Sequence, residues 1–382
     1  MIYLDNSATT MPHEEVVETF TRASTSYFGN PSSLHKLGGH AAALLEKARA
    51  KAGEFLEAKQ QHVVFTSGAT ESNNLAVQGT AYARQSRGKH LVISSLEHPS
   101  ILESAAYLER QGFEVTRVPP HTNGEVTVSS IEKALRKDTI LVSLMHVNNE
   151  TGAIMPIEAV GRMLKQYPTV HFHVDAVQAI GKIPVSFQQS GADSLSLSAH
   201  KIHGLKGTGL LLYRDTRHIM PLLFGGGQEA GARAGTENPA GAAAAVKALR
   251  LAVENQVEHA AHMRELNVQL EAFFASRPEV VINSPAERAP HILNVSCPGR
   301  MAETIVHALE EKDIYISTTS ACSSKISNES SVLKEMGADQ AVAESAVRIS
   351  LSGLTAAAEV HSFIEAWEQT VPQVAAAKGA GT

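Results

Sequence analysis

Short apolar segments alternate with helical segments between about residue 33 and residue 250 of this 382-residue chain. Parallel strands need a crossover connection, usually a helix, and they are apolar because both faces of their sheet are covered. The alternation therefore predicts an α/β fold with a mostly parallel sheet between layers of helices. The expected strands are Val63–Thr66, Leu91–Ser95, Ile140–Met145, His171–Val174, Ser194–Ser198 and Gly209–Tyr213, and the expected helices include Thr70–Ala83 and Ile157–Lys165.

The pattern of apolar and helical segments changes in the last third of the chain, which predicts a second, smaller α+β domain. A long helical stretch, Pro239–Phe274, leads into it. We expect the large domain to span residues 15–257 and the small domain to combine residues 1–14 with residues 258–382. The expected elements of the small domain are strands at Ile292–Val295, Ile314–Ser317 and Val347–Leu351, and helices near Glu303–Glu311, Ser331–Met336 and Thr355–Thr370.

Composition and charge argue against several classes of protein. The formal net charge of −6 argues against a general surface for nucleic acids or membranes. No apolar run reaches the ~20 residues of a membrane span, and the first residues lack the basic and apolar regions of a signal peptide. Two cysteines are too few for a disulfide framework, so we expect a reducing, cytoplasmic location.

Polar side chains stand where the expected strands end. Ligands of open α/β sheets bind at the carboxyl ends of the strands, so these side chains predict a ligand site. They are Ser67, His98, Asn148, Asn149, Asp175 and the segment Ser198–Lys201.

Lys201 and Asp175 are the most informative of these residues. Lys201 follows a strand end and precedes a glycine-rich turn. It is either an ordinary surface lysine or a lysine that forms a Schiff base. Asp175 ends a neighbouring strand. A lysine that carries an aldehyde as an imine, and a carboxylate that keeps a pyridine nitrogen protonated, are what pyridoxal phosphate (PLP) requires. The pair therefore predicts a PLP enzyme.

A metal site is the competing interpretation of the same strand. His171, His173 and Asp175 alternate onto one strand face, as metal ligands can. No other residue supplies an obvious fourth ligand, and strand histidines commonly pack or form hydrogen bonds. We therefore expect no metal.

Two further side chains suit a PLP site. His98 follows a strand, and its ring would stack on the cofactor or move protons; the alternative is an ordinary loop histidine. Gln178 would donate to the phenolate oxygen of PLP; the alternative is an ordinary amide at a helix start.

The segment Ser67–Thr70 runs from a strand into a helix and predicts a seat for the phosphate. Backbone N–H groups at a helix start bind anions. Thr70, with Asn73 nearby, would equally suit an ordinary helix cap, and both interpretations can hold. Ser198 and His200 are expected to add side-chain donors from the neighbouring strand end.

Cys322 lies in the most polar, serine-dense stretch of the chain, with Lys325 close by. The stretch predicts an exposed loop in which the thiol is accessible. Such a thiol is a nucleophile if its pKa falls below the usual ~8.5; the alternative is an incidental surface cysteine. Cys297 ends an apolar strand and is interpreted as structural.

The ordered motifs resemble those of the NifS/IscS-like cysteine desulfurases, PLP enzymes of the class-V aminotransferase family. The resemblance covers nearly the whole chain. The serine-rich loop, about residues 317–331, is similar to that of the long-loop subgroup, group I. The matching motifs are IYLDNSATT, FGNPSSLH, FTSGATESNN, EHPS, MHVNNETG, HVDAVQAIGK, SAHKIHGLKGTG, RAGTEN, SACSS and VRISLS.

The resemblance implies PLP fold type I, which is aspartate-aminotransferase-like. The large domain would hold a mostly parallel seven-stranded sheet. The smaller C-terminal α+β domain would carry the cysteine loop. Thr236 would reach the phosphate bound by the other subunit, which implies a homodimer.

The resemblance also implies a role for each matched residue. Lys201, Cys322 and His98 would be catalytic, Lys201 carrying PLP as an imine and Cys322 receiving sulfur. Arg348 would hold the substrate carboxylate, and Asn30 is a weaker candidate for the same pocket. The residues expected to contact PLP are Ala69, Thr70, His98, Asn149, Asp175, Gln178, Ser198, Ala199, His200, Lys201 and Thr236.

The sequence departs from the family pattern at a few positions. Ala230 stands where relatives often carry arginine, and Ala234 stands where they carry serine. Thr318 and Thr319 replace the usual Ser-Gly before the cysteine. These departures bear on loop conformation and partner choice more than on the chemistry.

The implied reaction removes sulfur from L-cysteine, which leaves L-alanine and a persulfide on Cys322. An acceptor protein would take the sulfur for iron–sulfur clusters, thiolated tRNA or thiamine. The alternatives are a selenocysteine lyase, another PLP-dependent transaminase or lyase, and a non-catalytic sulfur relay. A nucleotide-binding module is disfavoured because GLKGTG precedes a strand and does not open a helix. No direct nucleic-acid or membrane partner is expected.

Overall fold

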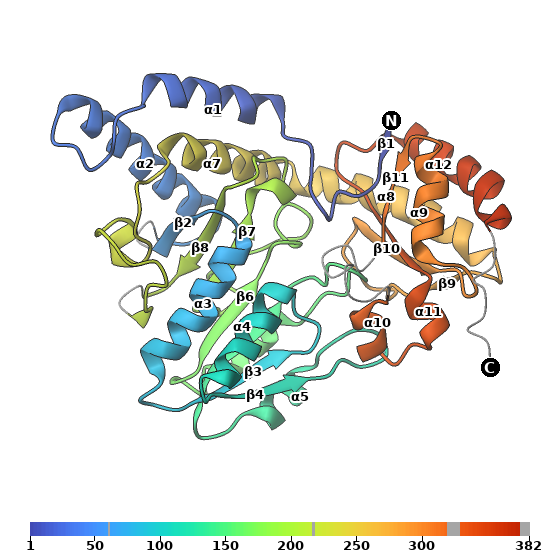
Figure 1. Ribbon diagram of the computed structural model, residues 1–382, viewed down its shortest axis with the longest axis horizontal. Coiled ribbons are helices and arrows are strands. Elements are labelled where there is room, and N and C mark those ends of the chain that lie inside the picture. Colours follow the sequence, from blue (N-terminus) through green and yellow to red (C-terminus); the bar gives the residue numbers. More distant parts are fainter. Residues whose placement is uncertain (60–61, 216–217, 319–328, 375–382) are drawn as a thin grey trace.

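A seven-stranded sheet forms the centre of the larger part of the molecule (Figure 1). The computed structural model describes residues 1–59, 62–215, 218–318 and 329–374. Across the sheet the strand order is β2 (Val63–Thr66), β8 (Gly209–Tyr213), β7 (Ser194–Ser198), β6 (His171–Asp175), β5 (Thr139–Met145), β3 (His90–Ser94) and β4 (Glu114–Val118).

The sheet is mostly parallel, as the alternation predicted. Strands β4, β3, β5, β6 and β7 run parallel, and β8 is antiparallel to both of its neighbours, β7 and β2. The strands expected from apolar runs are all present, with ends within about one residue of the prediction. Strand β4 was not predicted. It is an edge strand whose residues Glu114–Arg117 are not buried, so it lacks the apolar run of a central strand.

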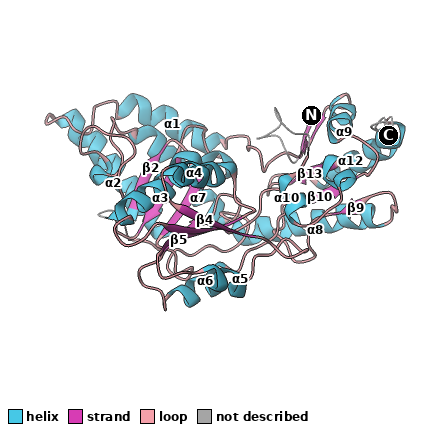
Figure 2. Ribbon diagram, turned by 60° about the horizontal axis from the view of Figure 1, so that its bottom comes forward, coloured by secondary structure: helices cyan, strands magenta, loops and turns pink. Residues whose placement is uncertain are grey.

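Helices cover both faces of this sheet (Figure 2). Residues of β3 show the two-sided burial directly: Val92 belongs to one apolar cluster, and Leu91 and Ile93 belong to another. Helices α3 and α4 pack together, and α1 and α2 both pack against α7. The helix bounds are α1 (Glu14–Ser26), α2 (Lys36–Phe55), α3 (Ala69–Arg84), α4 (Pro99–Arg110), α5 (Val128–Ala134), α6 (Ile157–Leu164) and α7 (Pro239–Glu254).

The smaller part of the molecule contains a four-stranded antiparallel sheet and a two-stranded parallel pair. The four strands are β12 (Ser317–Thr318), β13 (Ala346–Ser350), β10 (Ile292–Ser296) and β9 (Val281–Ile282), and the pair is β1 (Ile2–Tyr3) with β11 (Ile314–Tyr315). Its helices are α8 (Gln256–Ala275), α9 (Ala302–Glu310), α10 (Ser331–Glu335), α11 (Gln340–Glu344) and α12 (Ala357–Thr370).

Two expected elements of this part were wrong in extent. The strand expected at Ile314–Ser317 is divided at Ile316, because β11 pairs with the N-terminus while β12 pairs with β13. The helical stretch Pro239–Phe274 is divided at Asn255, whose side-chain amide donates to the Leu251 carbonyl at 2.9 Å and so caps α7.

A separate apolar cluster fills the smaller part. It joins Leu4 of the N-terminal segment to Phe274, Phe363 and Trp367. The division into residues 15–257, and 1–14 with 258–382, stays a prediction. Among the described residues, no helix is both long enough and apolar enough to span a membrane.

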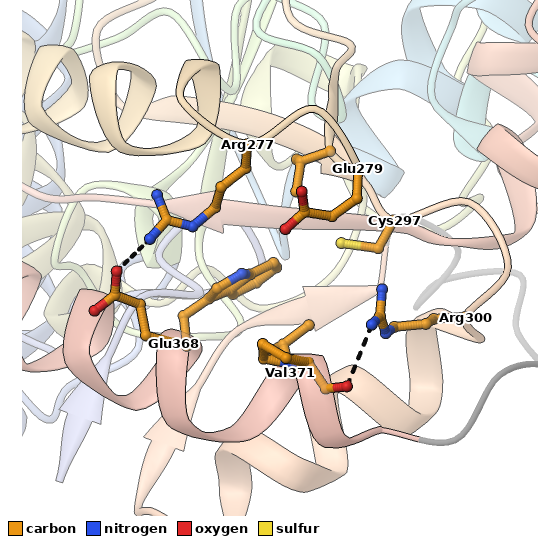
Figure 3. A pocket seen from close by; sticks show the side chains of 9 residues that line it. Arg277, Glu279, Cys297, Arg300, Glu368 and Val371 are labelled. Carbon is orange, nitrogen blue, oxygen red and sulfur yellow. Dashed lines mark hydrogen bonds and ion pairs between the residues drawn. The ribbon is translucent and has the colours of Figure 1, made fainter.

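Cys297 borders a cavity of about 260 Å³ in this smaller part (Figure 3). The side chain is 1% exposed, and burial raises the pKa of its thiol to about 11. At neutral pH the sulfur is therefore a protonated thiol, which agrees with the structural interpretation. Arg277 on the cavity wall is paired with Glu368.

Candidate active site

Lys201 lies at the carboxyl end of β7, in the short 3₁₀ helix η2 (Ala199–Lys201). Its Nζ donates to the carbonyl oxygens of Ser7, at 2.6 Å, and Ala8, at 2.7 Å. The turn that follows is closed by the Gly204 N–H, which donates to the Ala199 carbonyl at 2.8 Å. The lysine expected from the sequence is therefore half-buried at the strand end, against the N-terminal segment.

The N-terminal segment, residues 5–10, forms one wall of the site. Thr10 donates from both its N–H and its hydroxyl to the His200 carbonyl, each at 2.8 Å. The Thr9 hydroxyl lies 3.1 Å from His200 Nδ1. Sequence reasoning matched this segment to a motif but assigned no role to it. The signal available in the sequence was the three hydroxyl residues of this segment, Ser7, Thr9 and Thr10.

Asp175 ends β6 with only 5% of its surface exposed. Its Oδ2 accepts from Asn73 Nδ2 at 2.7 Å, and its Oδ1 accepts from the Val177 N–H at 3.0 Å. The alternative of a helix cap formed by Thr70, with Asn73 nearby, was wrong. Helix α3 begins after Gly68 and no side chain caps it, while Asn73 points to Asp175 from the second turn.

The charges of Asp175 and Lys201 both act on the ring of His98. It caps α4, and its Nδ1 accepts the Ser100 N–H at 3.1 Å, which leaves the proton of the neutral ring on Nε2. Burial lowers the pKa of His98; Asp175 raises it and Lys201 lowers it further. The ring is therefore neutral at pH 7.

Gln178 shares a partner with Lys201. Its Nε2 donates to the Ser7 carbonyl at 3.0 Å, the same oxygen that accepts from Lys201. Its Oε1 lies 3.3 Å from Nε2 of the buried His291, which sequence reasoning did not identify. The structure thus brings Gln178 close to Lys201, and its contact with the phenolate oxygen of PLP stays a prediction.

Arg348 and Asn149 meet at the same N-terminal segment. Arg348, in β13, is 5% exposed; its Nη1 donates to the Asn149 carbonyl at 2.8 Å and its Nη2 to Asp5 Oδ1 at 2.9 Å. Burial raises the pKa of Asp5, against the opposing effects of Arg348 and Lys201. The guanidinium is thus fixed in place before any substrate carboxylate arrives.

The start of α3 fits a phosphate group. Because no side chain caps this 16-residue helix, its first N–H groups, at Ala69 and Thr70, point toward the carboxyl ends of β2 and β7. A Cβ built on Gly68 would lie 3.6 Å from the Ser198 hydroxyl, so that hydroxyl belongs to the same region. The anion seat, the buried Asp175 and the amine of Lys201 are the groups that PLP needs, and these residues fit it.

The described part of the chain does not place three predicted residues, Asn30, Thr236 and Cys322, at this site. Asn30 is exposed between α1 and α2, and its Oδ1 accepts the Ser32 N–H at 2.9 Å. Thr236 is also exposed. Cys322 and Thr319 lie outside the described residues.

Three of the departures from the family pattern lie within the described residues. Ala230 has a positive φ of 55° in the short helix η4 (Glu229–Gly231), Ala234 is buried, and Thr318 lies in β12.

The histidines of the metal alternative form hydrogen bonds with neighbouring side chains. His171 Nε2 and His173 Nδ1 lie 2.8 and 2.9 Å from the Ser194 hydroxyl, and His173 Nε2 lies 3.1 Å from Asn73 Oδ1. In the described ranges, no group of three or more His, Cys, Asp or Glu side chains is placed to hold a metal ion.

Comparisons with known proteins identify the family of this chain. The family model described as aminotransferase class-V matches residues 2–363. A NifS/IcsS protein homolog of Lactobacillus delbrueckii subsp. bulgaricus is 46% identical and covers 97% of both chains. A cysteine desulfurase IscS of Dictyoglomus turgidum is 38% identical and covers 98% of this chain and 95% of its own.

Solved structures agree as well. A NifS-like protein superposes with a TM-score of 0.91 at 38% identity, over 96% of this chain and 98% of its own. A structure named SspA in complex with cysteine superposes with a TM-score of 0.81 at 32% identity, over 93% of this chain and all of its own (100%). The chain therefore belongs to the aminotransferase class-V family of PLP-dependent enzymes, among its NifS- and IscS-type cysteine desulfurases.

Proposed function

We propose that this enzyme removes sulfur from free L-cysteine, releases L-alanine and leaves the sulfur on Cys322 as a persulfide. The observation that carries the proposal is the convergence of Lys201, Asp175 and His98 at the carboxyl end of the sheet, with Arg348 fixed beside them. The names of the relatives support cysteine as the substrate.

Bound PLP supplies an electron sink that weakens the bonds to the substrate Cα. Lys201 would hold the cofactor aldehyde and, once released, move the proton of the Cα–H bond. Asp175 is fixed by Asn73 and the Val177 N–H, and its carboxylate would pair with the pyridine nitrogen. The neutral ring of His98 would stack on the cofactor, since it carries no charge at pH 7.

Substrate orientation would fall to Arg348. Its guanidinium is held from two sides by Asp5 and the Asn149 carbonyl, and it would bind the α-carboxylate of cysteine. Asn30 is proposed as a weaker contributor to the same pocket.

The Cys322 thiolate would form the new S–S bond to the substrate sulfur. The Cβ–S bond breaks at the same time, and its electron pair stays with the substrate carbon, which takes up a proton. No outside oxidant is needed, since the sulfur is oxidised from the thiol to the persulfide level while the Cβ, which keeps the electron pair and gains the proton, is reduced to the methyl group of alanine. An acceptor protein serving iron–sulfur cluster, thiolated tRNA or thiamine synthesis would then take the sulfur.

The enzyme is further proposed to act as a cytoplasmic homodimer. Within one chain Thr236 is exposed, which suits a role at the phosphate site of a second subunit.

The test uses the purified protein supplied with PLP and L-cysteine. We expect equal amounts of alanine and transferable sulfur, and a mass increase of one sulfur atom on the peptide that contains Cys322. Lys201→Ala should lose the visible absorption of bound cofactor and all activity. Cys322→Ala should keep the absorption but release no sulfide.

Either of two results would contradict the proposal. Unchanged cofactor colour in Lys201→Ala would exclude the lysine assignment. Sulfide release by Cys322→Ala would show that the protein thiol takes no part, as in a selenocysteine lyase or a simple lyase.

A further inference from the structure

Lys182 is a buried lysine to which the proposed reaction assigns no role. It follows β6 by a short turn and is 8% exposed. Its Nζ donates to the backbone carbonyl of Lys201 at 2.6 Å. Among the residues that the structure describes, no carboxylate forms an ion pair with it. A buried ammonium without a carboxylate partner is costly to keep, so its position requires an explanation.

The titratable groups that interact electrostatically with Lys182 in the described part of the chain are all basic. They are Lys201 from η2, His203 from the turn after it, His259 from α8 and His291 at the start of β10. Burial lowers the pKa of Lys182 to about 7, and the charge of Lys201 lowers it too. The three histidines also have lowered pKa values, mainly through burial, and are neutral at pH 7. Lys182 donates its hydrogen bond whether charged or neutral.

The main chain of Lys201 needs a hydrogen bond that does not involve its own side chain, so that it keeps its position when that side chain changes partners. The amine of Lys201 bonds to the carbonyls of Ser7 and Ala8, and it must leave them to attach a cofactor. The N-terminal segment holds the carbonyl of the preceding residue, His200, but not that of Lys201. The Lys201 carbonyl accepts its hydrogen bond from Lys182 instead, at 2.6 Å.

Lys182 is itself held by neighbouring helices. Gly181 precedes it with a φ of +74°, and a Cβ there would lie 2.9 Å from the Ala252 Cβ of α7. Gln256 of α8 donates to the Lys182 carbonyl at 3.4 Å. Lys182 therefore connects the segment after β6, which packs against α7 and α8, to the 3₁₀ helix η2 that contains Lys201.

We propose that Lys182 is a positioning residue, which fixes the main chain of Lys201 while the side chain of Lys201 exchanges its partners. The inference rests on the proposed attachment of PLP to Lys201. A displacement of about 1 Å at a reacting group can cost about 100-fold in rate. Loss of the donor is therefore expected to lower kcat with little change in KM.

The test compares Lys182→Met, which keeps the length but not the donor, with Lys182→Arg, which keeps a donor. Lys51→Met is the matched control, since Lys51 lies half-exposed on α2. We expect kcat to fall at least about tenfold in Lys182→Met, and to recover in part in Lys182→Arg. In cofactor-free protein, amide hydrogen exchange over residues 201–204 should rise in Lys182→Met but not in Lys51→Met.

A spectroscopic readout separates positioning from general stability. Below about pH 7 Lys182 carries a positive charge, which opposes protonation near Lys201. The low-pH part of the bound-cofactor titration should therefore move upward in Lys182→Met but not in Lys182→Arg. If Lys182→Met does not fold, Lys182→Gln serves instead with the same expected results, because its shorter side chain does not reach the carbonyl.

Wild-type kcat, wild-type exchange and an unmoved low-pH titration in Lys182→Met would overturn the positioning role. A fall in kcat that only follows a loss of bound PLP would overturn it too. Failure of the proposed function is distinguished by the wild-type protein. If borohydride reduction does not fix PLP to Lys201, or cysteine yields no alanine, the function itself is wrong.

Discussion

At the scale of single residues, burial decides the protonation of groups around the site. Glu150 follows Asn149 and is buried, and the Ser330 hydroxyl donates to it. Burial raises the pKa of Glu150 from 4.5 to about 7, although Ser330 and Arg348 lower it. The folded protein therefore holds a proton on Glu150 in a pH range where the unfolded chain has released it.

This difference predicts a pH-dependent stability. Between about pH 4.5 and 7 the folded state binds more protons, so the free energy of unfolding should fall as the pH rises through this range. The full loss is roughly 3 kcal/mol. Glu150→Gln is neutral at every pH, so urea unfolding at pH 5 and pH 8 should show a flatter dependence than in the wild type.

Glu158→Gln is the control for this prediction, because Glu158 is exposed on α6 in a 3.6 Å pair with Arg162. It should keep the wild-type dependence. The same slope in Glu150→Gln and wild type would show that Glu150 is ionised in the folded protein.

At the scale of elements, close backbone contact shapes the anion seat. Strand β8 begins at Gly209 directly against the turn that opens α3. A Cβ at Gly209 would lie 2.6 Å from the Gly68 Cα, a distance that real Cβ atoms do not show. The strand and the helix start approach this closely only because residue 209 has no side chain.

Gly209→Ala is therefore expected to push α3 away from the phosphate seat. We expect PLP affinity to fall at least about tenfold and the free energy of unfolding to fall by roughly 1–3 kcal/mol, as for other overpacked sites. Absorbance titration with PLP and urea unfolding measure the two effects.

Gly39→Ala is the matched control, because a Cβ at Gly39 in α2 would meet no atom within 4 Å. This substitution should be neutral or stabilising. Wild-type PLP affinity in Gly209→Ala would refute the proposed contact.

At the scale of the whole molecule, the proposed homodimer would cover apolar side chains that are exposed in one chain. Phe28 is 71% exposed and Phe224 is 77% exposed, and Leu34 is fully exposed. Phe224 lies in the segment that leads to Thr236, the residue expected to reach the other subunit. Burial of such side chains would stabilise the proposed homodimer.

We expect light scattering to give the mass of a dimer for the purified protein. Phe224→Asp should weaken the dimer, and activity should fall with dimer content. Val257→Asp is the control, since Val257 is 79% exposed on α8, in the other part of the molecule. A monomer that is fully active would exclude a shared active site.

The structure also shows how far sequence reasoning reaches in this molecule. Lys201 and Asp175 were predicted because they end apolar strands, and the ends of parallel strands meet at one sheet edge. The role of Asn73 was missed, because its partner Asp175 lies about a hundred residues away and α3 alone suggests only a cap. The edge strand β4 was missed because Val118 is the only one of its five residues that is buried.

The amino-acid sequence by itself determined the alternating α/β order, the strand ends and the residue types for PLP chemistry, because these follow from local apolar patterning and side-chain chemistry. Only the tertiary structure decided that Ser7 and Ala8 receive the amine of Lys201, that Asp5 holds Arg348 and that Lys182 reaches the Lys201 carbonyl. Each of these contacts joins segments from different elements, and it exists only when chain closure brings them together.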